Sequence, residues 1–590
     1  MSAMMLPSDD DLDDDLEPLY EDDRQRHFRW RDPKQKFLVA AAILGLVSVT
    51  ALIVVVTVTQ LHNMTTANGS ESPPVETTCG KVIGAYEEGI YVFKGMRYAE
   101  APVGPLRWRP PQKLDEQYDS SCQHTRKAFQ HGSKCSQRHT FIKSRIIGSE
   151  DCLFVNVWTP QVDSSANLPV MVYIHGGDLS SGSGNEPDET STPDLVMSAN
   201  MVFVTFNYRL GASGFLALDV LSFRSQEGVS GNYGFLDQIM ALVWVRDNIQ
   251  NFGGDPKMVT IFGHGSGGES VWALLMSSQA KGLFHNAWIM SGTPLFNTSR
   301  EQAEADNLVF LNSTGCVFAT SEDSESCIMS LSTEEALNSV PWQTFPFWNR
   351  SFEYDLPSAK ERAGAIGIVD GRFLPRTPKN SLLAGQFNDV PVVIGHTAQS
   401  AEEEIFLSPW NTWNWQDFEN YTKSQLDTIV ANLANLSSQY YPRIVSPLYQ
   451  LVTMVTDIRV TCPTNLHAAL VSESFRSPVY HYAVTSVPSS PVHHRGRAKH
   501  YAFQSWDLLA FFGMISRYTQ IVTSEDLQFS RNLRQMAFEF ARTGRLAHWK
   551  QFPEATAVIS KQIEPILDYK RDVCTSWRKH GIVPKYSKRS

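Results

Sequence analysis

One uncharged segment divides the chain into two unequal parts and limits how it can fold. Residues 37–59, FLVAAAILGLVSVTALIVVVTVT, contain no charge over 23 positions. A helix of this length, rising 1.5 Å per residue, crosses the ~30 Å hydrocarbon layer of a membrane. A cleaved signal peptide, the alternative, would have a shorter apolar region near the N-terminus and a small-residue cleavage site. Because 36 mostly polar residues precede the segment, the sequence predicts an uncleaved signal-anchor helix.

Basic residues are distributed unevenly about this predicted span. None follows it until Lys81, whereas six precede it: Arg24, Arg26, Arg29, Arg31, Lys34 and Lys36. Basic residues beside a span stay on the cytoplasmic side, so we expect a single-pass type II protein of the plasma membrane with a cytoplasmic N-terminus. Residues 1–36 then form a cytoplasmic tail, acidic at its tip and basic beside the membrane, which we expect to be disordered.

Residues 60–590 have the features of an extracellular polypeptide. Residues 60–78 are polar and are predicted to form a stalk. Seven N-glycosylation sequons follow the span, at Asn63, Asn68, Asn297, Asn312, Asn349, Asn420 and Asn435. The eight cysteines also follow it, an even number that suits disulfides in an oxidising space: Cys79, Cys122, Cys135, Cys152, Cys316, Cys327, Cys462 and Cys574.

Charge and spacing exclude two classes of partner. The net charge of −11 gives no basic surface of the kind that binds nucleic acid, so we expect no nucleic-acid partner. The cysteines and histidines do not follow a metal-ligand spacing, so we also expect no metal and no other cofactor.

Short apolar runs alternate with helical patterns from Lys81 onward. Six runs are typical of strands buried on both faces: 170–177, 201–209, 258–263, 286–292, 390–395 and 478–484. Two helical stripes are expected to end at Gly253 and Gly544; they consist of Ile239, Leu242, Val243 and Ile249, and of Leu533, Met536, Ala537 and Phe540. This alternation predicts an α/β fold with a central, mostly parallel sheet.

Several long motifs occur in a fixed order along the chain. They are VFKGMRYAEAPVGPLRWRPPQ, SEDCLFVNVWTP, NYRLGASGFLAL, GNYGFLDQIMALVWVRDNIQNFGGDPKMVTIFG and GLFHNAWIMSG. With them the sequence resembles the type-B carboxylesterase and cholinesterase family over residues 79–580, which leaves 581–590 as a C-terminal tail. The resemblance implies an α/β-hydrolase fold, in which a serine on a tight strand-to-helix turn attacks the substrate, a histidine takes its proton and an acid orients the histidine.

The resemblance places the catalytic serine, acid and histidine at positions where this chain has other residues. In IFGHGSGGES the place of the serine holds Gly265, which has no side-chain oxygen. Counting from the motif glycines gives Ser400 at the place of the acid and Gln504 at that of the histidine. In the stretch implied to bind the oxyanion, Asp178 would repel a developing negative charge. We therefore expect no catalytic residues, and a catalytically inactive member of the family.

Two alternatives stay open beside this interpretation. A serine esterase with a relocated nucleophile would use Ser266, with His500 and one of Glu402, Glu403 or Glu404. A shift by one residue points the side chain on a tight turn in another direction. Because a catalytic triad needs hydrogen bonds of about 2.6–3.2 Å, this change of direction argues against the alternative. A small-ligand carrier would use the former active-site gorge, lined by Trp342, Phe345, Phe347 and Trp348, although such an aromatic run is more often core or lid packing.

The resemblance also implies disulfide pairs and a function. It pairs Cys135 with Cys152, Cys316 with Cys327 and Cys462 with Cys574, and leaves Cys79 and Cys122 as a further pair. The family has a catalytically inactive branch of adhesion proteins, and among them is one with the N-terminus inside and the esterase-like domain outside. We therefore expect heterophilic cell adhesion, with an extracellular protein ligand of the secreted immunoglobulin type as partner. Homodimerisation is left open, because relatives often pair through C-terminal helices.

Overall fold

The computed structural model describes residues 70–114, 120–139, 145–294, 296–340, 355–359, 366–403 and 412–586. The predicted tail, the predicted span 37–59, the sequons at Asn63, Asn68 and Asn349, and the aromatic positions 342–348 lie outside these residues. Within the described ranges, no helix is both long and apolar enough to cross a membrane.

The folded unit begins earlier than the predicted boundary at Cys79. It starts at Ser70, and β1 (Val75–Thr77) pairs antiparallel with β2 (Gly80–Ile83). The predicted stalk therefore extends too far, because its last residues belong to this small sheet. Val75 is the reason, since its side chain is buried in the core although it lies in a mostly polar stretch with two prolines before it.

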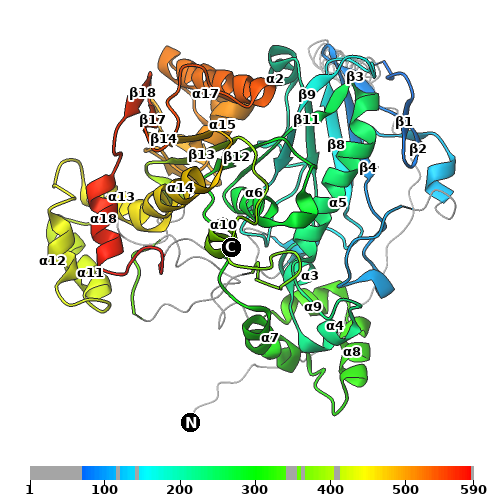
Figure 1. The fold of residues 1–590 in the computed structure, drawn as a ribbon, viewed down its shortest axis with the longest axis horizontal. Coiled ribbons are helices and arrows are strands. Elements are labelled where there is room, and N and C mark those ends of the chain that lie inside the picture. Colours follow the sequence, from blue (N-terminus) through cyan, green and yellow to red (C-terminus); the bar gives the residue numbers. More distant parts are fainter. Residues whose placement is uncertain are drawn as a thin grey trace, which may run out of the picture. The chain divides into compact units, whose positions relative to one another are not determined.

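An 11-stranded sheet lies at the centre of the described fold, in the order β18-β17-β14-β13-β12-β11-β9-β10-β8-β4-β3 (Figure 1). Its inner strands run parallel to one another: β9 (Leu168–Ile174), β10 (Val202–Phe206), β11 (Gly254–His264), β12 (Asn286–Met290), β13 (Val392–Thr397), β14 (Val479–Val484) and β17 (Thr556–Ile559). The outer strands pair antiparallel: β3 (Ala85–Glu87), β4 (Ile90–Arg97), β8 (Phe154–Thr159) and β18 (Ile563–Ile566). The sheet is thus mixed with a parallel centre, and all six predicted strands are confirmed.

Helices cover both faces of this sheet (Figure 1). Those used below are α5 (Tyr233–Asn248), α6 (Ser266–Met276), α14 (Cys462–Ser474), α15 (Trp506–Phe512), α17 (Ser524–Thr543) and α18 (Arg571–Lys579). The other α-helices are α2 (Pro193–Ala199), α3 (Gly211–Phe215), α4 (Asp219–Arg224), α7 (Arg300–Thr314), α8 (Ser321–Ser330), α9 (Thr333–Asn338), α10 (Pro378–Leu383), α11 (Trp415–Leu426), α12 (Leu433–Ser438), α13 (Pro447–Thr456) and α16 (Ile515–Tyr518). Short strands lie outside the large sheet: β5 (Arg126–Lys127), β6 (Gln137–Arg138), β7 (Ile146–Ile147), β15 (Val492–His494) and β16 (Arg497–Lys499).

The side chains of β9 show why the inner strands are continuous apolar runs. Val170, Val172 and Ile174 belong to one hydrophobic cluster, together with residues of α5 and α6. Met171 and Tyr173, which point to the opposite face, belong to a second cluster with residues of α15 and α17. Because each face of the strand is buried under helices, no position is left for an exposed polar residue.

Both predicted helices are confirmed, although α5 buries residues beyond its predicted apolar positions. α17 buries all four predicted positions and ends at Gly544, whose φ is 63°. α5 continues into a 3₁₀ turn that ends at Gly253, with φ of 88°. On α5, however, Asp237 and Gln238 are fully buried while Ile239 is only partly buried. The reason is a polar contact inside the core, because Asp237 forms an ion pair with Arg209.

Four disulfides join elements that are separate in the sequence. They link Cys79 to Cys122, Cys135 to Cys152, Cys316 to Cys327, and Cys462 to Cys574. These are the pairs that the family resemblance implies. The last one closes the largest loop, with a sequence separation of 112, and connects α14 to α18.

Candidate functional site

The turn between β11 and α6 is the sharp strand-to-helix turn on which a hydrolase of this fold carries its nucleophile. Gly265 forms this turn alone, with φ of 59° and ψ of −123°, and its backbone N donates to the Met290 carbonyl at 2.9 Å. The turn lies at the carboxyl end of a central parallel strand, where α/β folds place their sites. Glycine adopts a positive φ without the strain that a side chain would add.

Glycines around this turn differ in what their positions require. A Cβ atom at Gly267 would lie 2.1 Å from the Ile174 carbonyl oxygen, and one at Gly263 would lie 2.4 Å from the Gly267 backbone. At Gly265, by contrast, the contact within 4 Å is the Gln504 side-chain nitrogen at 3.0 Å. Close packing therefore excludes a side chain at 263 and 267, whereas position 265 has room for one.

Gln504 lies where a side chain at position 265 would point. It is buried directly before α15, and its carbonyl oxygen accepts a hydrogen bond from His264 Nε2 at 2.6 Å. The places of serine and histidine are thus neighbours, as the resemblance implies. A neutral amide has no basic nitrogen, so Gln504 offers no acceptor for a hydroxyl proton of the kind that an imidazole provides.

Ser400 lies three residues after the end of β13, at the position implied for the acid. Its hydroxyl lies 2.8 Å from Thr397 Oγ1 and donates to the Thr397 carbonyl at 3.0 Å. The side chain is buried and uncharged, and these contacts stabilise its own turn. It therefore supplies no negative charge to orient a histidine.

The loop that follows β9 is the stretch implied to bind the oxyanion. Asp178 and Leu179 both have a positive φ, of 56° and 54°. Such conformations cost on the order of 1–3 kcal/mol each for residues other than glycine. Hydrogen bonds hold Leu179 on both sides, because its N donates to Ser266 Oγ at 3.1 Å and its carbonyl accepts from Gly211 N at 2.7 Å.

Ser266, the candidate relocated nucleophile, is fully buried at the start of α6. Besides accepting from Leu179 N, its hydroxyl interacts with the Tyr208 side chain and lowers the pKa of that phenol, although burial raises it by more. Tyr208 in turn donates to the His175 carbonyl at 2.8 Å and stacks on the His175 ring. Burial raises the pKa of Tyr208 and lowers that of His175 to about 4, so both are neutral at pH 7. The serine hydroxyl therefore joins the loop to the turn as a structural contact.

The other residues of the relocated set come together without Ser266. Glu402 Oε1 accepts a hydrogen bond from His500 N at 2.7 Å and lies 3.6 Å from His500 Nδ1. Glu402 is buried, whereas about half of the His500 side chain is exposed. The side chain of Glu403 and the whole of Glu404 lie outside the described residues. Among the described contacts, Ser266 bonds to neither His500 nor Glu402.

A buried carboxyl group behind the turn was missed as a site residue. Asp507 Oδ1 lies 4.0 Å from His264 Nε2, and Asp507 Oδ2 accepts from the Tyr482 hydroxyl at 3.2 Å. Burial raises the pKa of Asp507 to about 7. The sequence pattern does not single out Asp507, although an acid three positions after an expected catalytic residue is itself a signal.

The predicted modification sites that can be examined are accessible. Asn297, Asn312, Asn420 and Asn435 are exposed, as oligosaccharide attachment requires. Glycosylation at these positions stays a prediction.

A comparison with protein families decides the relationship. The model of the Carboxylesterase family matches residues 71–577. The chain belongs to this family. Para-nitrobenzyl esterase of Bacillus subtilis (strain 168) is 32% identical, with 82% of this chain and 93% of that protein covered. Cocaine esterase of Homo sapiens is 30% identical, with 84% and 89% covered. Neurotactin of Drosophila melanogaster is 29% identical, and the match covers 87% of this chain and 57% of neurotactin.

Solved structures of esterases share the fold of this family member. Carboxylesterase EST55 of Geobacillus stearothermophilus superimposes with a TM-score of 0.70 at 27% identity, covering 86% of this chain and all of that one. A PNB esterase structure gives 0.68 at 29% identity, with 85% and 99% covered. The chain therefore has the α/β-hydrolase fold with a large mixed sheet.

Proposed function

We propose that this carboxylesterase-family protein is catalytically inactive and acts at the cell surface, where its extracellular domain binds another protein in heterophilic cell adhesion. The observation that supports the loss of catalysis best is Gly265 on the strand-to-helix turn, directly facing Gln504. An acyl-transfer reaction needs an attacking hydroxyl or thiol and a base beside it. This turn carries a hydrogen atom and an amide in those two places.

The proposal that the protein acts at the cell surface rests on two features of the sequence and on one relative. An apolar segment at 37–59 follows six basic residues, and seven sequons follow that segment. Neurotactin is a homologue, and we transfer to this chain the adhesion role that the family resemblance implies. Para-nitrobenzyl esterase and cocaine esterase are homologues of similar identity, so the residues at 265, 400 and 504, rather than the relatives' names, favour the inactive role.

Two assays on the full-length chain test the proposal. Cells that express it are mixed with differently labelled cells of several tissues, and we expect mixed aggregates with some partner cells and none among the expressing cells alone. Detergent-solubilised protein is then assayed for hydrolysis of a p-nitrophenyl ester and for labelling by a serine-reactive phosphonate, with the Bacillus esterase as positive control. We expect neither hydrolysis nor labelling.

A matched variant separates the proposal from the relocated esterase. If Ser266 were a nucleophile, the phosphonate would label the unchanged protein and labelling would disappear in Ser266→Ala. That result would contradict the inactive role. A failure to form mixed aggregates with any cell type or with secreted immunoglobulin-type proteins would contradict the adhesion role separately.

A further inference from the structure

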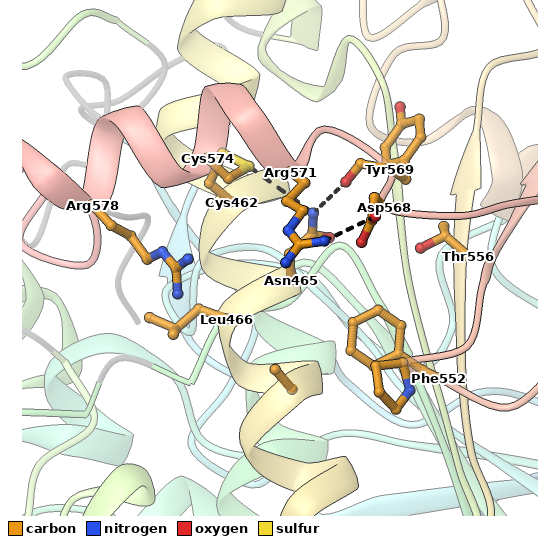
Figure 2. A pocket seen from close by; sticks show the side chains of 12 residues that line it. Cys462, Asn465, Leu466, Phe552, Thr556, Asp568, Tyr569, Arg571, Cys574 and Arg578 are labelled. Atoms are coloured by element: carbon orange, nitrogen blue, oxygen red, sulfur yellow. Dashed lines mark hydrogen bonds and ion pairs between the residues drawn. A yellow bond between two sulfur atoms is a disulfide. The ribbon is translucent and has the colours of Figure 1, made fainter.

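We propose that a pocket between α14 and α18 binds an acidic sugar, that is, a pyranose ring bearing a carboxylate. This α14–α18 pocket has a volume of about 280 Å³. It is lined by α14, by the loop before β17, by the turn after β18 and by α18 (Figure 2). It shares no lining residue with the turn at Gly265, so the proposal holds whether or not the protein hydrolyses esters.

The walls of the α14–α18 pocket are fixed before any ligand arrives. The disulfide between Cys462 and Cys574 joins α14 directly to α18, and both sulfurs belong to lining residues. Asn465 on α14 donates through Nδ2 to the Tyr569 carbonyl at 3.1 Å, which holds the turn before α18 (Figure 2). A site that is ordered in advance loses less conformational entropy on binding than a flexible one.

A guanidinium group at the pocket is available to an anion. Arg578 makes no ion pair within the described part of the chain, and its side chain has a long hydrogen bond of 3.5 Å to Thr575. The other lining arginine, Arg571, neutralises Asp568 through an ion pair of 2.9 Å. The segment 568–590 has seven basic and two acidic residues, although the whole chain has a net charge of −11. A guanidinium binds a carboxylate through two parallel hydrogen bonds.

An oxygen atom at the pocket can accept a hydrogen bond as well. Asp568 lines the pocket, and its carboxylate, bonded to Arg571 through Oδ2, offers Oδ1 as a further acceptor. A carboxylate oxygen only accepts hydrogen bonds, so a ligand must meet it with a donor. A simple anion has no such donor, whereas a sugar hydroxyl is a donor. The pocket therefore fits a molecule that has both a carboxylate and hydroxyl groups.

The remaining wall is apolar. Leu466 and Ala469 of α14 face the pocket together with Phe552 and Pro553. A pyranose presents an apolar C–H face on one side, which packs on aromatic and aliphatic groups, and polar hydroxyls at its edge. One ring with its carboxylate is of the size that a cavity of about 280 Å³ holds.

Binding of defined sugars to the full-length protein tests this assignment. The probes are glucuronate and N-acetylneuraminate, with neutral glucose and simple acetate as comparisons. Saturation-transfer NMR detects contact, and titration calorimetry gives Kd. We expect both acidic sugars to bind at least 10-fold more tightly than glucose or acetate. Equal binding of glucose, or no saturation transfer to either acidic sugar, would overturn the proposal.

Variants on one helix locate the binding. Arg578→Gln is expected to weaken acidic-sugar binding at least 10-fold, whereas Lys579→Gln, one residue on and not in the lining, is expected to leave it unchanged. Thermal midpoints equal to that of the unchanged protein show that both variants are folded. An unchanged Kd in Arg578→Gln, or an equal loss in Lys579→Gln, would contradict the site. If sialyllactose binds as tightly as free N-acetylneuraminate, the ligand is the terminal sugar of a glycan. If the monosaccharide alone binds, the ligand is the free acidic sugar.

Discussion

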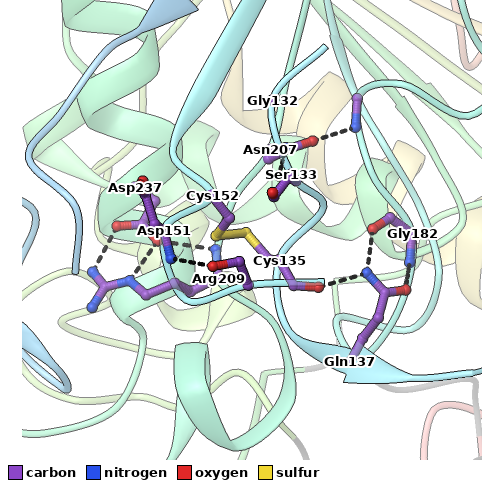
Figure 3. Close-up of a disulfide and its surroundings, with 12 residues drawn as sticks. Gly132, Ser133, Cys135, Gln137, Asp151, Cys152, Gly182, Asn207, Arg209 and Asp237 are labelled. Carbon is purple, nitrogen blue, oxygen red and sulfur yellow. Dashed lines mark hydrogen bonds and ion pairs between the residues drawn. A yellow bond between two sulfur atoms is a disulfide. The ribbon is translucent and has the colours of Figure 1, made fainter. Parts of the chain in front are cut away.

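Two regions that follow inner strands of the sheet, one after β11 and one after β10, fix their backbones in different ways. The Gly265 turn, residues 263–268 with the loop 175–179 beside it, depends on the absence of side chains and on backbone hydrogen bonds. The Arg209 region, which comprises Arg209, Asp237 and the Cys135–Cys152 disulfide, depends on side chains with specific partners (Figure 3). Figure 3 also shows Gln137 bonded to the Cys135 carbonyl and to both backbone groups of Gly182.

The comparison indicates that the fold depends on its buried ion pair more than on the side chains at positions 265, 400 and 504. Arg209 Nη2 and Nε contact the two Asp237 oxygens at 2.6 and 2.8 Å, and no solvent reaches the carboxylate. Loss of either partner leaves a charge in the core. Gly265, Ser400 and Gln504 carry no charge, so the backbone around them does not depend on a buried ion pair.

Breaking the ion pair should have the largest effect on stability. Asp237→Asn leaves Arg209 charged and buried, and we expect it to lower the free energy of unfolding by about 3–5 kcal/mol. Urea unfolding followed by tryptophan fluorescence measures this change. Glu554→Gln removes the exposed partner of Lys550 on the protein surface and is the matched control, for which we expect little change. A similar small change in both variants would show that the Arg209 region is not held by its charges.

Removing the disulfide that closes the longest loop should have an effect as large as breaking the ion pair, and the effect of removing a disulfide should depend on loop length. Cys462→Ser with Cys574→Ser opens a sequence separation of 112, for which the chain-entropy account gives about 4–5 kcal/mol. Cys316→Ser with Cys327→Ser opens a separation of 11, for which it gives about 3 kcal/mol. Thermal unfolding of the two double variants ranks them. The reverse ranking would mean that local strain, rather than the unfolded chain, determines the stabilisation.

Substitutions at the Gly265 turn should distinguish a glycine that is favoured by its positive φ from one that is required by close packing. Gly265→Ser adds a side chain at positive φ with only the end of Gln504 close by, so we expect a loss of about 1–3 kcal/mol and a folded protein. Gly267→Ser, the control, places its Cβ against the Ile174 carbonyl oxygen and should disrupt the turn. The Gly265→Ser protein should still show no ester hydrolysis, because Gln504 is not a base. Turnover by this single variant would show that another group serves as base.

Sequence alone predicted the framework of the fold well and the polar interior poorly. Strands such as β9 and the buried face of α17 were predictable, because burial on both faces or on one face leaves a regular apolar pattern. The burial of Asp237 inside α5 leaves no such pattern, since an acidic residue usually lies at the surface. Gly265 was placed by its motif, but the room beside it and the bonding of Ser266 to Leu179 depend on loops that meet only in three dimensions.

Acid should affect the Gly265 turn through His175, with the smallest effect of the set. Burial lowers the pKa of His175 to about 4, against about 6.5 in the unfolded chain. Below pH 6.5 the unfolded state therefore binds the extra proton, and the stability that neutral His175 allows is lost as the pH falls toward 4. At pH 5.5 this loss amounts to about 1.4 kcal/mol relative to pH 7.5.

The variant His175→Asn isolates this contribution, because asparagine does not titrate and its Nδ2 lies at the same distance along the side chain as His175 Nδ1, which contacts the Gly176 carbonyl at 2.8 Å. We expect the difference in unfolding free energy between pH 7.5 and pH 5.5 to be smaller in the variant by about 1.4 kcal/mol. An unchanged pH dependence would mean that His175 becomes protonated inside the fold. The loop beside Gly265 would then tolerate a charge on His175. In that case the Gly265 turn and the Arg209 region would not differ in whether they contain a buried charge.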